Sequence, residues 1–488
     1  MIFDVSRRAN ESQQLRTRAV QGTVFLTIRH ILVTLLGIVG LLYMTRIVGP
    51  AGYGLYAAAF GVVRYFGLIS EGGVQMYLLR APRNVPSDLF HQAFWWLLFA
   101  SLTAVPMLVL ALFIAGRFWV RTEEFTPVAV ALILCMPLSL LASIPMAIVE
   151  RALEYRRVAL VETLSQVGYY ATGILLALRG WDVWAFVGAF WVGQFLIFGG
   201  YYTVARFRPR WRWEWLTIRQ MTRESLKMGM AAWIYELRLL APAIVLMPLT
   251  NETIVGYYGL AQRLTSALGF VRDAIARLSV PIYARVQDEG AKLLEVVRLS
   301  SLAQMLGLAG LYLPLIFLGS FVLPVIFGKK WDIPTVLLVF AIMAANQFFF
   351  VIFGAFNQAL LVVKQTHVFA KAGGAYVICS FALSALLVIL TPEPYKLQGY
   401  AVAISLAYVP TYYWMMHVNT ARYIGRPRYG INLLWAAGLG AAMFAPFTGY
   451  WSLLGLLVFL HPASGRAWRE IIGLLREARG AKNEASQG

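Results

Sequence analysis

The chain has 488 residues, of which 60% are hydrophobic and only 13% are charged, and its formal net charge is +19 at pH 7. An average soluble chain is about 45–50% apolar and about 25% charged, so this composition excludes a water-soluble enzyme and indicates a protein of the lipid bilayer. The two cysteines are too few for a disulfide framework or a cysteine metal site.

Apolar runs of membrane-spanning length follow one another along the chain. Residues 1–19 carry four arginines among polar residues, which indicates a retained cytoplasmic leader and not a cleaved signal peptide. The predicted spans of the first half are 20–45, 55–79, 92–115, 126–149, 158–178 and 183–204. Those of the second half are 228–249, 254–280, 299–325, 333–356, 372–391 and 399–420, followed by a hairpin at 431–447 and 450–462. The sequence therefore predicts an all-α polytopic membrane protein with about 14 transmembrane helices.

The order of the spans predicts two lobes of six helices each, joined by a polar segment. The predicted domains are a leader and N-terminal lobe at 1–204, an inter-lobe linker at 205–227, a C-terminal lobe at 228–420, a terminal helical hairpin at 431–462 and a cytoplasmic tail at 463–488.

The distribution of the basic residues predicts the orientation of the chain. If Met1 is cytoplasmic, the loops on its side hold 29 Lys and Arg, and those on the opposite side hold seven. Cytoplasmic loops carry the excess of Lys and Arg in membrane proteins, so both termini are predicted to be cytoplasmic. Most of the net charge then reflects topology and not a nucleic-acid site.

The predicted linker is rich in arginine and tryptophan, with the sequence RFRPRWRWEWL at 206–216. This alternation is typical of a segment in the headgroup layer, with its rings at the interface and its cations on anionic lipid. Membrane lipids are therefore predicted partners, and nucleic acid is not.

The start of the second span in each half carries the same turn residues. Gly54 and Tyr56 recur 202 residues later as Gly256 and Tyr258, and Glu71 falls on Asp273 at the same offset. A six-helix repeat about an axis along the membrane normal is a known transporter architecture. Proline inside a span removes a backbone donor, and Pro242 is interpreted as a hinge or as a tolerated packing kink. The predicted structural turn and hinge residues are Gly49, Pro50, Gly54, Tyr56, Pro242, Gly256 and Tyr258.

Ten charged residues fall inside the predicted spans, six arginines and four acids. A charge at the bilayer centre costs at least about 2.5–3.5 kcal/mol, so such residues are expected to face a water-filled cavity or a partner. Arg277 and Glu162 are interpreted as snorkelling to the membrane surface. The candidate substrate-binding residues are Arg29, Arg64, Arg238, Arg263 and Arg272. The candidate ion-coupling residues are Glu71, Glu236 and Asp273.

Motifs of several enzyme classes are missing from the sequence. There is no G-x-x-x-x-G-K-[ST] loop for a nucleotide, and the five histidines are scattered, without metal-ligand spacing. These features favour a secondary transporter without a cofactor over an enzyme, with coupling to a proton or Na⁺ gradient as the expected source of energy.

Three segments resemble one family of transporters. The turn RIVGPAGYGLYA at 46–57, the turn at 255–261 and FGKKW at 327–331 resemble Wzx-type polysaccharide flippases of the multidrug/oligosaccharidyl-lipid/polysaccharide exporter superfamily, in the colanic-acid-exporter-like branch. The resemblance implies two six-helix lobes in a MATE-like V around a cavity. It also implies that polyprenyl-pyrophosphate-linked oligosaccharide is moved across the bacterial inner membrane, with polysaccharide polymerase and chain-length proteins as partners. The extra hairpin is similar to that of the lipid II flippases in the same superfamily.

The balance of arginines and acids inside the predicted spans distinguishes an anionic cargo from a cationic one. Arginine binds phosphate by paired donors, so six arginines against four acids favour an anionic lipid pyrophosphate over the cationic cargo of a multidrug antiporter. A MATE-like multidrug or cation antiporter, a lipid II-type flippase and a non-transporting scaffold of an envelope polysaccharide complex remain alternatives.

Overall fold

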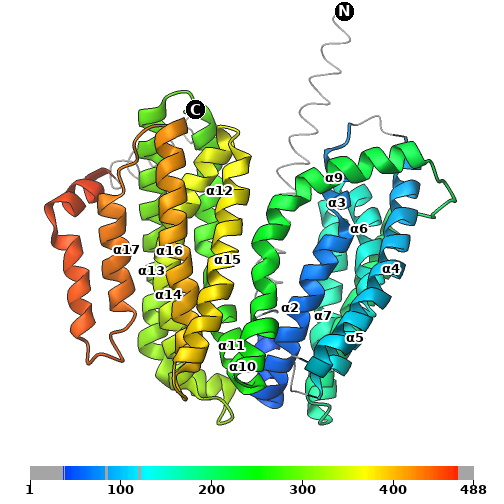
Figure 1. The fold of residues 1–488 in the computed structure, drawn as a ribbon, viewed down its shortest axis with the longest axis horizontal. Helices are drawn as coiled ribbons and strands as arrows, with labels where there is room; N and C mark the ends of the chain where they lie inside the picture. Colours follow the sequence, from blue (N-terminus) through cyan, green and yellow to red (C-terminus); the bar gives the residue numbers. More distant parts are fainter. Residues whose placement is uncertain (1–36, 38, 83–85, 119–122, 471–488) are drawn as a thin grey trace, which may run out of the picture. The chain divides into compact units, whose positions relative to one another are not determined.

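The computed structural model describes residue 37 and residues 39–82, 86–118 and 123–470. All regular secondary structure in these residues is helical, which confirms the predicted all-α class (Figure 1). The predicted leader at 1–19 and Arg29 lie outside the described residues. The chain forms two compact units, unit 1 (Met1–Gly256) and unit 2 (Tyr257–Gly488), which are described separately. The predicted domain boundaries, with six helices in each lobe, stay predictions.

Unit 1 begins, within the described residues, with an apolar helix at Val39–Val48. The helices that follow are α2 (Pro50–Glu71), α3 (Val74–Arg80), α4 (Asp88–Phe118), α5 (Phe125–Ile133), α6 (Met136–Arg151), α7 (Tyr155–Leu178), α8 (Val183–Ala205), α9 (Trp215–Glu236) and the first residues of α11 (Glu252–Leu268). Between α9 and α11 lie a 3₁₀ turn, η1 (Leu237–Leu240), a π-helical segment, η2 (Pro242–Leu246), and α10 (Met247–Leu249).

The predicted span at 55–79 is broken between α2 and α3 by two adjacent glycines. Gly72 and Gly73 have φ values of +66° and +75°, a left-handed conformation that glycine adopts without steric cost. A Cβ on Gly73 would come within 2.7 Å of the carbonyl oxygen of Ser225, so the same glycine also permits close packing of the α2–α3 break against α9.

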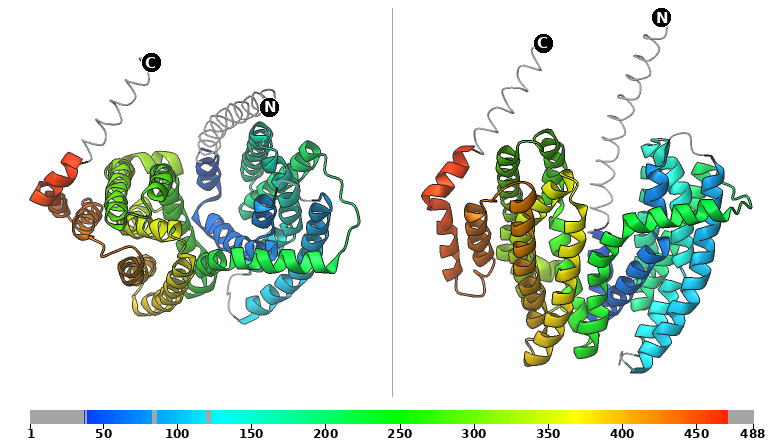
Figure 2. Two further views of the ribbon diagram at one scale, coloured as in Figure 1. Left: turned by 90° about the horizontal axis from the view of Figure 1, so that it is seen from above. Right: turned by 45° about the horizontal axis from the view of Figure 1, so that its top comes forward.

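Helix α9 crosses the helices of unit 1 at a steep angle, as two views show (Figures 1 and 2). It is held there by its buried face, which includes Ile218 and Met221. Met221 belongs to an apolar cluster with residues of α3, α4 and α6, among them Val74, Leu97 and Ile144. Half of the segment predicted as a linker, from Trp215 onward, is therefore helical and packed on unit 1.

Unit 2 is a bundle of helices (Figure 1). Its remaining helices are α12 (Phe270–Arg285), α13 (Gly290–Phe327), α14 (Ile333–Val362), α15 (Thr366–Leu390), α16 (Lys396–Tyr423), α17 (Gly430–Ala442) and the 3₁₀ segment η3 (Trp451–Leu460). Helix α14 contacts α12, α13, α15, α16 and α17, and it buries apolar residues on several faces, including Phe340, Phe348 and Phe356. A helix that is apolar all round is expected at the centre of a membrane bundle.

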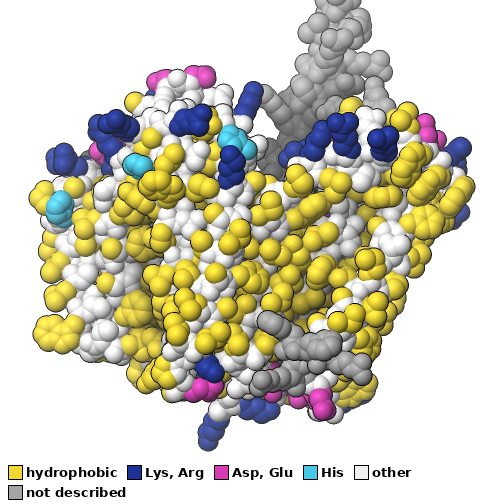
Figure 3. Space-filling model, viewed as in Figure 1, with side chains coloured by type: hydrophobic (Ala, Val, Ile, Leu, Met, Phe, Trp, Pro, Cys, Tyr) yellow, Lys and Arg dark blue, Asp and Glu magenta, His cyan; other side chains and the backbone are white. Residues whose placement is uncertain are grey.

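Seven helical stretches of the described residues are long and apolar enough to cross a membrane. In the face shown, hydrophobic side chains cover the middle of each unit, and Lys and Arg gather at the helix ends (Figure 3). The chain is therefore a multi-pass membrane protein. The number of crossings and the cytoplasmic position of the termini stay predictions.

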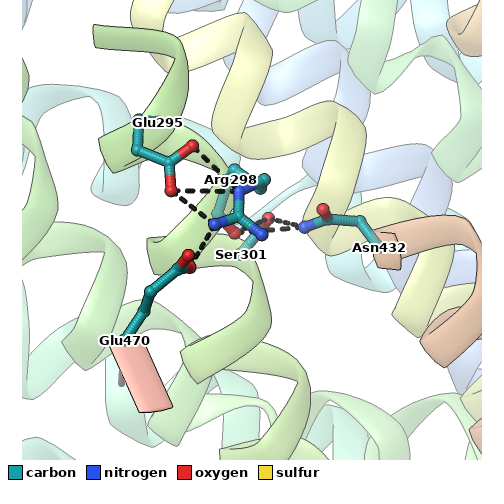
Figure 4. Close-up of polar contacts among 5 residues, drawn as sticks. All are labelled: Glu295, Arg298, Ser301, Asn432 and Glu470. Atoms are coloured by element: carbon teal, nitrogen blue, oxygen red, sulfur yellow. Dashed lines mark hydrogen bonds and ion pairs between the residues drawn. The ribbon is translucent and has the colours of Figure 1, made fainter. Parts of the chain in front are cut away.

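A polar cluster fastens the terminal hairpin to α13 (Figure 4). Arg298 on α13 donates to Glu295, one turn earlier on the same helix, and to Glu470 near the end of the described chain. Asn432 on α17 donates to the carbonyl oxygen of Arg298 at 3.1 Å and to the hydroxyl of Ser301 at 2.6 Å. One arginine thus joins three parts of unit 2.

Candidate functional site

The predicted turn at the start of α2 has the conformation that its residues favour. Gly49 precedes the helix with a φ of +90°, and Pro50 occupies the first turn, where its missing N–H costs nothing. A Cβ on Gly54 would overlap the carbonyl oxygen of Glu252, and a Cβ on Gly256 would overlap the carbonyl oxygen of Pro50. The first turns of α2 and α11 therefore cross with their backbones in contact at the two repeat-related glycines.

The two repeat-related tyrosines each pack against another tyrosine. The hydroxyl of Tyr56 lies 3.2 Å from that of Tyr169 on α7, and the Tyr56 ring stacks on Phe186 of α8. In unit 2, the ring of Tyr258 meets that of Tyr400 on α16 edge-on, with 5.0 Å between centroids. Each tyrosine thus fixes its helix against a later helix of its own unit.

Two predicted charges of unit 1 lie on α2. Arg64 is exposed, and Glu71 is half-buried at the end of the helix, where its carboxylate accepts a hydrogen bond from the Gln75 backbone at 3.2 Å. Arg64 and Glu71 form no ion pair in the described structure. Two helical turns separate the residues, so they share one face of α2.

The other predicted charges of unit 1 lie where α9 gives way to η1. Arg238 pairs with Glu236 at 3.2 Å and lies over the ring of Tyr235 at 4.5 Å. A Cβ on Gly61 would lie 2.5 Å from the carbonyl oxygen of Leu239, so η1 packs closely on α2 one turn before Arg64. The four candidate residues described in unit 1 therefore lie on α2, at the end of α9 and in η1.

The break in helical geometry coincides with the predicted hinge. Pro242 begins the π-helical segment η2, and only Ala241 separates it from the 3₁₀ turn η1. Proline cannot donate to the carbonyl one turn earlier, so the regular α-helical pattern ends before it. Whether this break moves during function stays a prediction.

Unit 2 contains a polar cluster around Arg272 on α12. Its guanidinium donates to Asp273 at 2.9 Å and to the side-chain oxygen of Gln347 on α14 at 2.7 Å. It also lies over the ring of Phe350, 5.0 Å from the centroid. The Arg272 side chain is 21% exposed and that of Asp273 is 52% exposed. The arginine is therefore mostly covered by the protein, and the acid beside it is largely accessible.

The remaining charged residues lie apart from this cluster. Arg263 is exposed on α11, before the break at Gly269 that separates α11 from α12, and Arg277 is exposed further along α12. Glu162 on α7 is half-buried and accepts a hydrogen bond from Tyr201 at 3.4 Å. The structure therefore gathers the candidate residues into one group in unit 1 and one in unit 2, with Arg263 outside both.

Two residues of the Arg272 cluster, Gln347 and Phe350, are not among the residues predicted from the sequence. Both are neutral residues on α14, and the sequence signal for this site is the adjacent polar pair Asn346 and Gln347 within the mostly apolar run at 333–356.

Comparison with known proteins gives the family. Residues 43–334 match the model of the family described as polysaccharide biosynthesis protein. The succinoglycan biosynthesis transport protein ExoT of Rhizobium meliloti (strain 1021) is 23% identical over 293 residues, which cover 59% of this chain and 58% of that protein. The match thus spans less than two thirds of the relative's length.

Solved structures give the fold. The lipid II flippase MurJ, in an inward closed conformation, matches with a TM-score of 0.68 and 14% identity, over 93% of this chain and all of that chain. A eukaryotic MATE transporter, AtDTX14, matches with a TM-score of 0.52 and 12% identity, over 83% and 98% of the two chains. These matches confirm the predicted resemblance, and the chain belongs to the polysaccharide biosynthesis protein family, with the fold of the multidrug/oligosaccharidyl-lipid/polysaccharide exporters.

Proposed function

We propose that the protein is a secondary transporter that flips polyprenyl-pyrophosphate-linked oligosaccharide from the inner to the outer leaflet of the bacterial inner membrane. It works by alternating access, carries out no catalysis and uses no cofactor. The observation that carries this proposal is Arg272, which is fixed by Asp273 and Gln347 yet remains partly open. A fixed guanidinium presents paired donors to a pyrophosphate at little cost in side-chain entropy.

The other arginines support the same anionic cargo. Arg64 and Arg263 are exposed on helices α2 and α11, and Arg238 is held by Glu236 and Tyr235 beside α2. Together with Arg29 of the first predicted span, we assign these residues to the binding of pyrophosphate and acidic sugars. The relative ExoT is described as a succinoglycan biosynthesis transport protein, which supports a saccharide as the cargo of this chain.

Energy coupling is assigned to the acids beside the arginines. Glu236 pairs with Arg238 and Asp273 pairs with Arg272, and Glu71 shares one face of α2 with Arg64. Protonation or Na⁺ binding at such a carboxylate would weaken its hold on the arginine and so link a gradient to cargo release. The polysaccharide polymerase and chain-length proteins are the proposed partners, and both termini are assigned to the cytoplasm.

A flipping assay tests the proposal. Purified protein in proteoliposomes should move a fluorescent polyprenyl-pyrophosphate oligosaccharide between leaflets, and Arg272→Ala should abolish this movement while the protein still inserts. Arg277→Gln, an exposed arginine on the same helix, should leave flipping unchanged. Transport of cationic dyes in place of the lipid-linked saccharide would support the multidrug antiporter, and a protein that moves neither would be a scaffold.

A further inference from the structure

The segment between α8 and α9 is bound along its length to the start of α4. We call residues 206–214, which have no regular secondary structure, the strap. The indole N–H of Trp95 donates to the carbonyl oxygen of Arg210 at 2.9 Å, and the Arg210 N–H donates to His91 at 3.3 Å. Through these backbone contacts the strap takes one defined path on unit 1.

The tryptophans of the strap form a row of rings on α4. Trp211 meets Trp95 edge-on at 4.7 Å, and Trp213 meets Phe99 edge-on at 5.4 Å. Trp211 nevertheless remains 62% exposed, as does Trp215 at the start of α9. Rings that are fixed by neighbours and still largely uncovered are expected where a membrane interface covers them.

Cations flank this row of rings. Arg208 and Arg210 of the strap, with Arg219 and Arg223 of α9, are exposed and form no ion pair with an acid of the described chain. Arg212 pairs with Asp88 at 3.6 Å. In the space-filling view, Lys and Arg side chains lie in a row over α9, above a continuous hydrophobic surface (Figure 3).

We propose that the strap and the first turns of α9 form a binding site for anionic phospholipid headgroups of the adjacent leaflet. The helix beneath the strap favours lipid over nucleic acid, because α4 is apolar enough to span a membrane and only 22% of its apolar window is buried. The rings are therefore continuous with a surface that faces acyl chains, and the arginines sit at headgroup level, where each cation attracts anionic lipid.

This site has a consequence for the rest of unit 1. The strap leads directly into α9, and α9 leads into η1, which carries Arg238. Lipid held at the strap would fix α9 along the membrane surface and so fix the position of η1 on α2. The inference needs only membrane insertion and holds whatever the cargo is.

A titration of the purified full chain in detergent tests the proposal. Phosphatidylglycerol is expected to raise the thermal unfolding midpoint more than phosphatidylcholine at equal concentration. The double variant Arg208→Gln/Arg210→Gln should weaken the apparent affinity for phosphatidylglycerol about 30-fold, because each cation near an anionic surface strengthens binding by a factor of about five to six and the two factors multiply. The charge-preserving variant Arg208→Lys/Arg210→Lys should retain most of the wild-type affinity for phosphatidylglycerol.

A matched control separates the strap from net charge. Arg426→Gln/Arg428→Gln removes two exposed arginines at the same spacing from another segment without regular structure, and it should leave the affinity unchanged. Equal effects of the two lipids on the wild type, an unchanged affinity in the strap variant, or an equal loss in the control would each overturn the proposal. Displacement of phosphatidylglycerol by inorganic phosphate or short single-stranded RNA at constant ionic strength would also overturn it.

Discussion

The position of Arg272 depends on a residue of another helix. Its pairing with Asp273 joins neighbours in the sequence, whereas its hydrogen bond to Gln347 crosses 75 residues and joins α12 to α14. Gln347 is a neutral acceptor, so it fixes the guanidinium without adding a second negative charge to that of Asp273. The arginine can therefore be oriented by α14 and still attract an anion.

Loss of that acceptor is expected to weaken cargo binding. Gln347→Leu removes the partner of one guanidinium nitrogen of Arg272, which costs about 1 kcal/mol, and we expect about fivefold weaker binding of the lipid-linked oligosaccharide. Isothermal titration in detergent measures this. Gln365→Leu, in the turn after α14, serves as the control and should bind normally. Wild-type affinity in Gln347→Leu would show that α14 does not position Arg272.

The acid beside Arg272 is expected to control coupling. Asp273→Asn keeps a side-chain acceptor next to the guanidinium but cannot exchange a proton or bind Na⁺ as a carboxylate does. We expect it to bind cargo and to flip it without dependence on a pH or Na⁺ gradient. Glu289→Gln, an exposed acid paired with Lys292, should keep the wild-type dependence. If Asp273→Asn also keeps it, the acid is structural and the driving force acts elsewhere.

At the scale of the elements, the first turns of α2 and α11 meet at two glycines. No side chain fits between them, because the backbone of each helix occupies the place of the other's Cβ. The contact therefore depends on Gly54 and Gly256 together, and the repeat seen in the sequence has a steric reason at these two positions.

A single methyl group is expected to disrupt this crossing. Gly54→Ala should lower the stability of the protein by at least about 2 kcal/mol, since helices in close contact must separate. Gly199→Ala on α8 adds the same methyl group where nothing lies within 4 Å, and it should be neutral or stabilising. Thermal unfolding midpoints in detergent compare the two. Equal unfolding midpoints for the two variants would mean that α2 and α11 can separate at little cost in stability.

The sequence predicted the position of helices better than their breaks. Apolar length placed the span at 183–204, and the structure has α8 at Val183–Ala205, because hydrophobicity alone defines such a helix. The break at Gly72–Gly73 was missed, since two glycines within an apolar run are tolerated in many helices and acquire meaning only through Ser225 on α9. The pairing of Arg272 with Asp273 could be inferred from adjacency. The contact with Gln347 could not, because it depends on how α12 packs on α14.

At the scale of the whole molecule, the open prediction is the number of crossings. Helix α17 and η3 are apolar but short, with 13 and 10 residues, and the chain between them turns at 443–450. A hairpin that crosses the membrane twice would give the predicted 14 helices, with its turn on the side opposite the termini.

Labelling with a membrane-impermeant thiol reagent shows whether the terminal hairpin crosses the membrane. In a chain without its two cysteines, Thr448→Cys at the hairpin turn should be labelled from outside the cell, and Arg426→Cys only after the membrane is opened. Both positions are exposed. Labelling of Thr448→Cys from the cytoplasmic side alone would reduce the transmembrane helices to 12.

The cluster at Arg298 also limits where the chain can be shortened. Glu470 binds Arg298, and Trp468 packs against Trp435 with 5.3 Å between the ring centroids. A protein cut before residue 468 loses both contacts at once and leaves Arg298 with Glu295 as its acid partner. A truncation that ends at the last apolar helix would therefore loosen the hairpin. A shortened protein should keep the chain through residue 470, with any purification tag placed after it.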